Sequence, residues 1–239
     1  TEDLRTLNTN NLVFVPANPS SPDSIKVSGN DSVQFALRVY PGGADSATAK
    51  SYIEYIYTLK GNDYMVGYKV KFVGMQGYIA QNTRDLSLLW STTLQQQEKS
   101  LKTEQTQSTI HYMDVAGEVD YLSETKDQKE RIPTAIKWVS FKQQFFSSTL
   151  IAADKFESTD IETIGFAPEN QNRQVKTMKS AYILPYSFDT DQTYNLQWFF
   201  GPNKYKVMRQ YGLNLERQIP LGWSFFLMQW INRYAVIPV

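Results

Sequence analysis

Residues 52–73 read YIEYIYTLKGNDYMVGYKVKFV, and this stretch decides the fold class. Over its second half, apolar and aromatic residues fall on one face while Lys69 and Lys71 fall on the other. Gly61-Asn62-Asp63 is a short polar connection of the kind that joins the two strands of a hairpin. The stretch therefore predicts an antiparallel β-hairpin whose buried face carries Tyr64, Val66, Tyr68, Val70 and Phe72.

The same two-residue alternation continues on both sides of the hairpin. Upstream, Val33 to Val39 alternates apolar with polar residues, and Leu12 to Val15 is an apolar run in a polar region, which indicates an edge strand. Residues 93–108 are expected to form a solvated excursion or a short helix, and Ser123 to Arg131 a charged loop. Further strands are predicted over residues 86–92, 109–113, 117–122, 134–141, 145–153, 161–166, 174–186 and 193–200. Short strands separated by polar turns favour antiparallel sheets packed face to face, and hence an all-β fold.

Composition supports a large β domain and excludes several functions. Of the 239 residues, 41% are hydrophobic and 14% aromatic, enough for a substantial core. The 24 basic residues balance the 24 acidic ones, so charge does not favour a nucleic-acid partner. The absence of cysteine excludes a disulfide scaffold, a thiolate metal site and a cysteine nucleophile. There is no signal peptide and no initiating methionine, so we expect a fragment of a longer membrane protein.

The strand alternation ends at residue 200. Pro202 suits the first position of a helix, because its missing N–H costs nothing there, and Gly212 supplies a stop. Between them, large side chains recur at helical spacing at Tyr205, Met208 and Tyr211. We therefore expect helix mostly within residues 202–236. We also expect two regions: a β domain over residues 1–200 and a helical segment over residues 201–239.

The last part of the chain, residues 223–239, carries a broad apolar face and a single charge. It is too short and too interrupted for a membrane span, which needs about 20 apolar residues. Its composition is typical of a helix lying in a membrane surface, although a buried C-terminal helix that closes a core has the same pattern. The candidate residues for contact with a membrane or a helical bundle are Trp223, Phe226, Leu227, Trp230, Ile231, Arg233 and Tyr234.

Three sequence motifs resemble a known family. Residues 198–205 read WFFGPNKY and are followed by LERQIPLGW at residues 215–223; residues 138–146 read WVSFKQQFF; residues 86–90 read LSLLW. Taken along the chain from residue 86 to the C-terminal end, they follow the order found in bacterial YidC-type membrane protein insertases of the YidC/Oxa/Alb family, and they resemble the large periplasmic domain of those proteins. The resemblance spans residues 86–239. It implies that the motif residues are structural, namely Trp138, Gln143, Gln144, Phe145, Phe200, Gly201, Pro202 and Gly222.

The resemblance also carries expectations about fold and function. It implies an antiparallel β-supersandwich of the galactose mutarotase-like type with a short C-terminal helical tail, preceded in the family by further strands. It implies a non-enzymatic scaffold and docking surface, in the periplasm at the inner membrane, for a protein that inserts and folds membrane proteins. The implied partners are the protein's own transmembrane bundle, the membrane surface, the Sec translocon and nascent membrane proteins, with no nucleic acid.

Few residues suggest a catalytic or metal-binding role. The sequence contains no second histidine and no cysteine that could act with His111 as a metal ligand. We therefore expect His111 to be a strand residue with a hydrogen-bonded ring nitrogen. Glu118 and Asp120 should share a solvated strand face. The cluster Asp154, Glu157, Asp160 and Glu162 is interpreted as a solvated turn, since its spacing matches no calcium loop. No nucleophile motif or phosphate-binding loop occurs, so we predict no catalytic residues, no cofactor and no metal.

An alternative from another class is a carbohydrate-binding or carbohydrate-modifying β-sandwich. Tyr182, Tyr186 and Trp198 could stack on a sugar, although core positions explain them better. Adjacent Gln143 and Gln144 cannot share one face of a strand, so one should turn inward and bond to the backbone at a bend.

Overall fold

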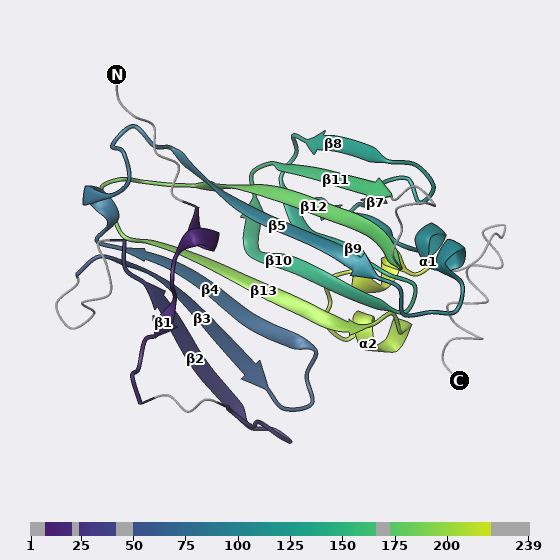
Figure 1. Cartoon of the computed structure of the whole chain (residues 1–239), viewed down its shortest axis with the longest axis horizontal. Helices are drawn as coiled ribbons and strands as arrows, with labels where there is room; N and C mark the ends of the chain where they lie inside the picture. The colour runs from purple at the N-terminus through teal and green to yellow at the C-terminus, as the bar shows by residue number, and fades with distance from the viewer. Residues whose placement is uncertain (1–7, 21–23, 42–49, 166–172, 221–239) are drawn as a thin grey trace. The chain divides into compact units, whose positions relative to one another are not determined.

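The computed structural model describes residues 8–20, 24–41, 50–165 and 173–220 (Figure 1). The strands are β1 (Val15–Pro16), β2 (Ser32–Val39), β3 (Tyr52–Lys60), β4 (Met65–Val73), β5 (Asp85–Gln95), β6 (Thr109–Asp114), β7 (Val119–Tyr121), β8 (Gln128–Ile132), β9 (Ile136–Lys142), β10 (Phe146–Phe156), β11 (Thr159–Gly165), β12 (Gln174–Pro185) and β13 (Gln192–Pro202). The α-helices are α1 (Leu101–Gln107) and α2 (Tyr205–Arg209); 3₁₀ turns are η1 (Thr9–Asn11), η2 (Met75–Gly77) and η4 (Leu215–Gln218).

The chain divides into two compact units. Unit 1 comprises residues 1–87, 152–154 and 184–198, and unit 2 comprises residues 88–151, 155–183 and 199–239. Strands β5, β10, β12 and β13 each contribute residues to both units. The division predicted at residue 200 stays a prediction.

Unit 1 contains the hairpin on which the fold prediction rests. Its strand order is β1-β2-β3-β4-β13. Strands β3 and β4 pair antiparallel from Tyr52 opposite Val73 to Leu59 opposite Val66, as the alternation predicted. In the turn, Asn62 has a φ of 55°, and the Asp63 carboxylate accepts the N–H of Met65 at 2.9 Å.

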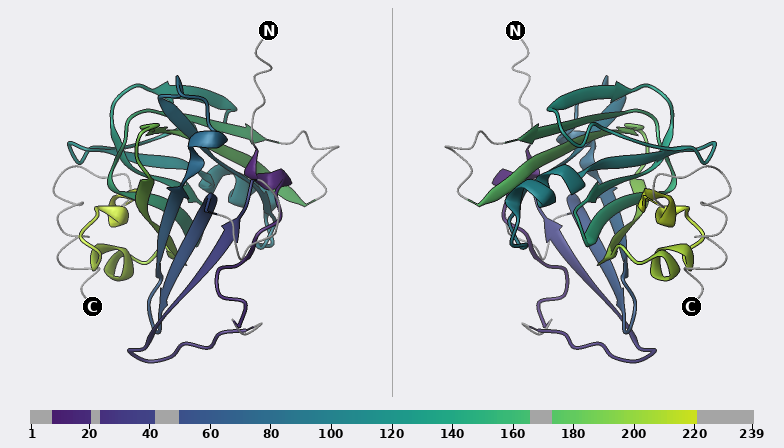
Figure 2. Two further views of the ribbon diagram at one scale, coloured as in Figure 1. Left: turned by 90° about the vertical axis from the view of Figure 1, so that its left-hand side faces the viewer. Right: turned by 90° about the vertical axis from the view of Figure 1, so that its right-hand side faces the viewer.

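Unit 2 is a sandwich of two antiparallel sheets. One layer runs β13-β10-β9-β6-β7 and the other runs β5-β12-β11-β8 (Figures 1 and 2). The ring of Trp90 on β5 stacks on that of Phe141 on β9 with 3.6 Å between centroids, which joins the two layers. Phe156 and Tyr182, both without solvent exposure, pack 4.3 Å apart in the same core. The predicted all-β supersandwich with short helices near its C-terminal end is confirmed.

Two segments differ from the expected loops. The predicted charged loop at Ser123 to Arg131 is wrong in its second half, because β8 pairs there with β11 and sets Lys129 opposite Glu162. A charged edge strand resembles a loop in sequence, since charges are a common way to protect a sheet edge.

The solvated excursion expected over residues 93–108 is also wrong in part. Strand β5 extends to Gln95, and Glu104 in α1 is buried because its carboxylate accepts the N–H groups of Gln97 and Glu98.

His111 also departs from expectation. Its ring is only 6% exposed and stacks on Tyr121 with 5.0 Å between centroids. Neither ring nitrogen has a hydrogen-bond partner in the described part of the chain, so the predicted bonded nitrogen is wrong. Burial, and secondarily the charge of Lys142, lower the pKa of His111 to about 3. The imidazole is therefore neutral at neutral pH.

We expect the joint between the two layers of unit 2 to dominate stability. Phe141→Ala should lower the free energy of unfolding by about 3–5 kcal/mol, because it leaves a cavity against Trp90. Phe146→Ala is a matched control at a side chain that is 60% exposed, and it should cost less than about 1 kcal/mol. Urea denaturation monitored by tryptophan fluorescence measures both; equal costs would contradict this account of the core.

His111 should make stability depend on pH. Its pKa falls from 6.5 to about 3 on folding, so the unfolded chain binds more protons between these values and stability is lost as the pH falls through that window. His111→Phe removes this term. Between about pH 7 and pH 4.5 the wild type should lose roughly 2–3 kcal/mol more than the variant. Urea unfolding at each pH tests this, and parallel pH profiles for the two proteins would refute it.

Candidate functional site

Two of the sequence motifs meet in unit 2. The motif at residues 138–146 forms the end of β9, the turn after it and the start of β10, and the motif at residues 198–205 forms the end of β13 and the start of α2. Gln143 closes the turn by donating its N–H to the carbonyl of Phe146 at 2.8 Å. We call the region where the two motifs meet, residues 143–147 with residues 200–205, the junction.

Asn203 holds the junction together. Its side-chain Nδ2 donates to the carbonyls of Gln143 at 2.8 Å and Gln144 at 3.4 Å, and its Oδ1 accepts the hydroxyl of Ser147 at 2.6 Å. Its backbone N–H donates to the carbonyl of Phe145 at 2.8 Å. One asparagine therefore satisfies several polar groups of a tight turn.

The segment after β13 is held along unit 2 by further bonds. Trp138 is fully buried, and its indole Nε1 donates to the carbonyl of Leu213 at 2.8 Å. Asn214, at a φ of 55°, points its amide at the sulfur of Met113, 3.8 Å away. Arg217 donates to the carbonyl of Gly117 at 2.6 Å and lies 3.6 Å from the carboxylate of Glu118. The path of residues 203–218 is therefore defined by side chains of β6, β9 and the turn after β6.

The predicted helical stretch is partly confirmed. Tyr205 and Met208 are buried on α2, and Gly212 has a φ of 67°, which suits a helix stop. Pro202 is not the first helical residue: it ends β13, and α2 begins at Tyr205. The strand continues through Gly201-Pro202 because Asn203 is bonded to the β9–β10 turn, so the chain becomes free to coil only after it.

The other motif residues fall into two groups. Trp138 and Gly201 are buried, whereas Phe145 and Phe200 are about half exposed, at 51% and 50%. Gln143 and Gln144 lie in the turn. The prediction that one of them bonds inward fails for Gln144, whose buried Oε1 has no partner among the described residues. The remaining predicted residues lie outside the described part of the chain, namely Gly222, Trp223, Phe226, Leu227, Trp230, Ile231, Arg233 and Tyr234.

Sequence reasoning missed Asn203 as the central residue of the junction. It stands inside the motif WFFGPNKY, directly after a glycine and a proline that end a strand. A short amide side chain at such a place can bond to neighbouring backbone groups, and that preference could have identified it.

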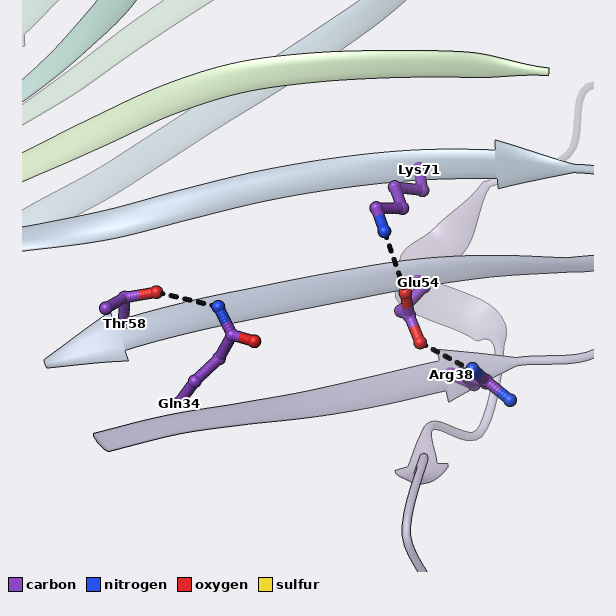
Figure 3. Close-up of polar contacts among 5 residues, drawn as sticks. All are labelled: Gln34, Arg38, Glu54, Thr58 and Lys71. Atoms are coloured by element: carbon purple, nitrogen blue, oxygen red, sulfur yellow. Dashed lines mark hydrogen bonds and ion pairs between the residues drawn. The ribbon is translucent and has the colours of Figure 1, made fainter. Parts of the chain in front are cut away.

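Unit 1 carries a polar cluster on adjacent strands, shown in Figure 3. Glu54 is only 6% exposed and accepts Nε of Arg38 at 2.7 Å, with Nζ of Lys71 at 3.8 Å. Beside it, Gln34 donates to the hydroxyl of Thr58 at 3.2 Å. The Glu54 carboxylate lies between two cations, so we interpret it as part of a structural ion pair.

The acidic residues considered for chemistry are solvated or paired. Glu118 and Asp120 are exposed, as predicted. The acidic cluster is not a single turn: Asp154 belongs to β10, and Asp160 and Glu162 belong to β11. Within the described residues, no group of three or more histidine or acidic side chains could hold a metal ion.

The proposed sugar-stacking aromatics do not form an exposed set. Tyr182 is completely buried and Tyr186 is 6% exposed, so neither presents a ring face to a ligand. The hydroxyl of Tyr182 is bonded to that of Ser180 at 2.9 Å. The core interpretation of these tyrosines is confirmed.

Over the part of the chain that the structure describes, no helix has the length and apolar character needed to cross a membrane.

Solved structures with a similar backbone fold include a galactose mutarotase-related enzyme from Lactobacillus acidophilus. It matches 79% of this chain and 71% of its own at 8% identity and a TM-score of 0.35. A GH36 α-galactosidase from Geobacillus stearothermophilus matches 83% of this chain and 30% of its own, at 6% identity and a TM-score of 0.39. Likeness at this level says nothing about activity.

Sequence relatives give a consistent answer. The chain is 34% identical to the membrane protein insertase YidC of Parabacteroides distasonis over 98% of this chain and 35% of the relative. It is 32% identical to that of Porphyromonas gingivalis over 100% of this chain and 36% of the relative. The chain thus spans about a third of the length of the curated relatives it matches.

A family model agrees with these relatives. The model described as the YidC periplasmic domain matches residues 24–234, which include both motifs of the junction. The chain therefore belongs to the family of YidC periplasmic domains.

Proposed function

We propose that this chain serves a membrane protein insertase as a non-catalytic scaffold, located in the periplasm at a bacterial inner membrane. The observation that carries the proposal is the junction. Asn203 and Trp138 bond the segment that follows β13 to the β9–β10 turn and to β9. A chain held in this way leaves the β-sandwich in a fixed direction.

A fixed exit matters if the chain continues into a transmembrane bundle. Rotation about a few unrestrained backbone dihedrals would let two domains reorient freely, whereas a segment bonded at several points transmits the position of one domain to the next. The scaffold would then orient the insertase's own bundle, in which nascent membrane proteins are handled. The Sec translocon is a further proposed partner for the exposed surfaces of the scaffold.

The relatives' names support a role in insertion and not in a chemical reaction, because each is called an insertase. Glu54, which is paired with Arg38, and the solvated Glu118 offer no positioned acid and base. The carbohydrate alternative has no observation in its favour once Tyr182 and Tyr186 are buried.

The junction can be tested in the full-length insertase. Asn203→Ala leaves several carbonyl and hydroxyl groups unpaired, which should weaken the attachment by about 1–3 kcal/mol. We expect membrane insertion of a reporter protein to fall severalfold. Asn195→Ala is the matched control, since Asn195 is an exposed residue on the same strand β13, and it should insert normally.

Urea unfolding of the isolated 239-residue chain accompanies this test, so that loss of folding is separated from loss of coupling. Normal insertion by the Asn203→Ala protein would defeat the scaffold proposal. So would a defect that the Asn195→Ala protein shares.

Residues 223–239 provide a second test, which concerns attachment to a membrane surface. We propose that Trp223 and Trp230 insert at the interface as parts of an amphipathic helix. The fragment should then float with anionic liposomes, and Trp223→Ser combined with Trp230→Ser should strongly reduce flotation. Phe146→Ser, which changes an exposed aromatic residue on β10, is the control. If the intact fragment remains in the aqueous fraction, the buried core helix is the correct interpretation.

A further inference from the structure

The outer face of strands β2, β3 and β4 in unit 1 gathers the charged side chains of these strands. The three strands contain five charged residues, and four of them are basic. Arg38, Glu54 and Lys71 lie opposite one another across the strands. Lys69 is two residues before Lys71 on β4, and Lys60 is six residues after Glu54 on β3. Residues separated by an even number share one face of a strand, so all five side chains point the same way.

The opposite face of these strands is apolar and aromatic, without a charged residue. Phe35, Tyr57 and Tyr68 lie in a row across it, with 5.0 Å and 5.2 Å between neighbouring ring centroids. The charged face is the one turned to solvent. Lys60 and Lys69 are exposed, and the side chain of Lys71 is 38% exposed.

The one acidic residue on the outer face is enclosed by basic partners (Figure 3). Glu54 is 6% exposed, with Nε of Arg38 at 2.7 Å and Nζ of Lys71 at 3.8 Å. The guanidinium of Arg38 also lies over the ring of Tyr52, 4.2 Å from its centroid. The acidic charge is thus paired within the sheet, and the charge presented to solvent is basic. Because the whole chain has no net charge, this face is a local excess of positive charge.

The basic residues are spread over the face and do not converge on one point. Lys60 lies six residues along β3 from Glu54, a distance of roughly 20 Å. The positions between them are uncharged on all three strands, as at Ile56, opposite Ala36, and at Thr58, opposite Gly67. A site for one small anion needs several donors aimed at the same place. A broad array of cations instead suits an extended anionic surface.

The rest of this chain offers no matching acidic segment. The ranges that the structure does not describe are residues 1–7, 21–23, 42–49, 166–172 and 221–239, and none of them contains more than two acidic residues. Two acidic residues cannot match four basic ones spread over such a distance. A bilayer that contains anionic lipids presents many negative charges side by side, and the inner-membrane location proposed above brings the chain close to one.

We propose that the outer face of the β2-β3-β4 sheet binds the anionic phospholipid headgroups of a bilayer surface. Lys60, Lys69 and Lys71 contact lipid phosphates without insertion into the hydrocarbon, and each strengthens binding about fivefold. Salt weakens the contact because it screens exposed charges. This inference rests on the proposed location at a membrane, but it involves neither the junction nor residues 223–239.

Cosedimentation of the 239-residue chain with vesicles of phosphatidylcholine, with or without phosphatidylglycerol, tests the proposal. Lys60→Gln combined with Lys69→Gln leaves the Glu54 ion pair intact and should weaken binding to the anionic vesicles about tenfold or more. Lys126→Gln combined with Lys129→Gln is the matched control, since it makes the same charge change at exposed residues of unit 2 and should bind like the wild type. Residues 223–239 are present in all three proteins and contribute equally.

Several outcomes would overturn the proposal. Equal binding by the wild type and a folded Lys60→Gln, Lys69→Gln protein would exclude this face. Equal losses in the two double variants would show that only net charge matters. Displacement of the chain from the vesicles by a soluble hexaglutamate peptide would assign the face to an acidic polypeptide. None of these results affects the junction, which is tested by insertion.

A second measurement holds even if the variant fails to fold, which circular dichroism would reveal. Acetylation of lysines in the wild-type chain is followed by mass spectrometry. Anionic vesicles should protect Lys60 and Lys69, and leave Lys126 and Lys129 reactive. Protection at none of them, or at all of them, would contradict the proposal. In the full-length insertase in neutral detergent, prior protection of Lys60 and Lys69 would show that another part of the protein covers this face, and would also overturn it.

Discussion

The amide of Asn203 is the interaction on which the rest of unit 2 depends. By bonding to the carbonyls of Gln143 and Gln144, it fixes the β9–β10 turn and the end of β13 to each other. The end of β13 determines where α2 can begin, and α2 places Leu213 against the indole of Trp138. One side chain thus sets the register between a hairpin and a segment that follows it by many residues. Its removal should be costly, because the carbonyls of Gln143 and Gln144 would lose this donor.

Sequence patterns predicted the strands well where one face of a strand is buried and the other is solvated. The β3–β4 hairpin is the clearest case, because tyrosines and valines alternate with lysines. The method failed at β8, where the polar side chains of Gln128, Lys129 and Glu130 belong to an edge strand. Charge there reflects protection of the edge, and only pairing with β11 reveals the strand.

The junction was predictable only in part. The motifs identified Trp138 and the Gln143-Gln144 turn as structural, but neither propensity nor spacing indicated that the two motifs are in contact. Pro202 illustrates the difficulty: local preference favours a helix start, yet bonds from Asn203 to residues 143–147 keep it in a strand. Contacts between residues about 60 positions apart, such as Asn203 with Gln143, cannot be inferred from local periodicity.

The need to protect sheet edges explains why β8 was not predicted as a strand, and it also bears on β5. Selection against aggregation removes long neutral edges unless something pairs with them. In unit 2, charge at Lys129 and Arg131 protects one edge of the smaller sheet, while β5 at the other edge has the alternating side chains of an interior strand. Leu88 and Trp90 are positioned to be covered from both sides, yet β12 covers them from one. Within the described residues, charge therefore marks β8 as an edge strand, whereas β5 has the alternation of an interior strand.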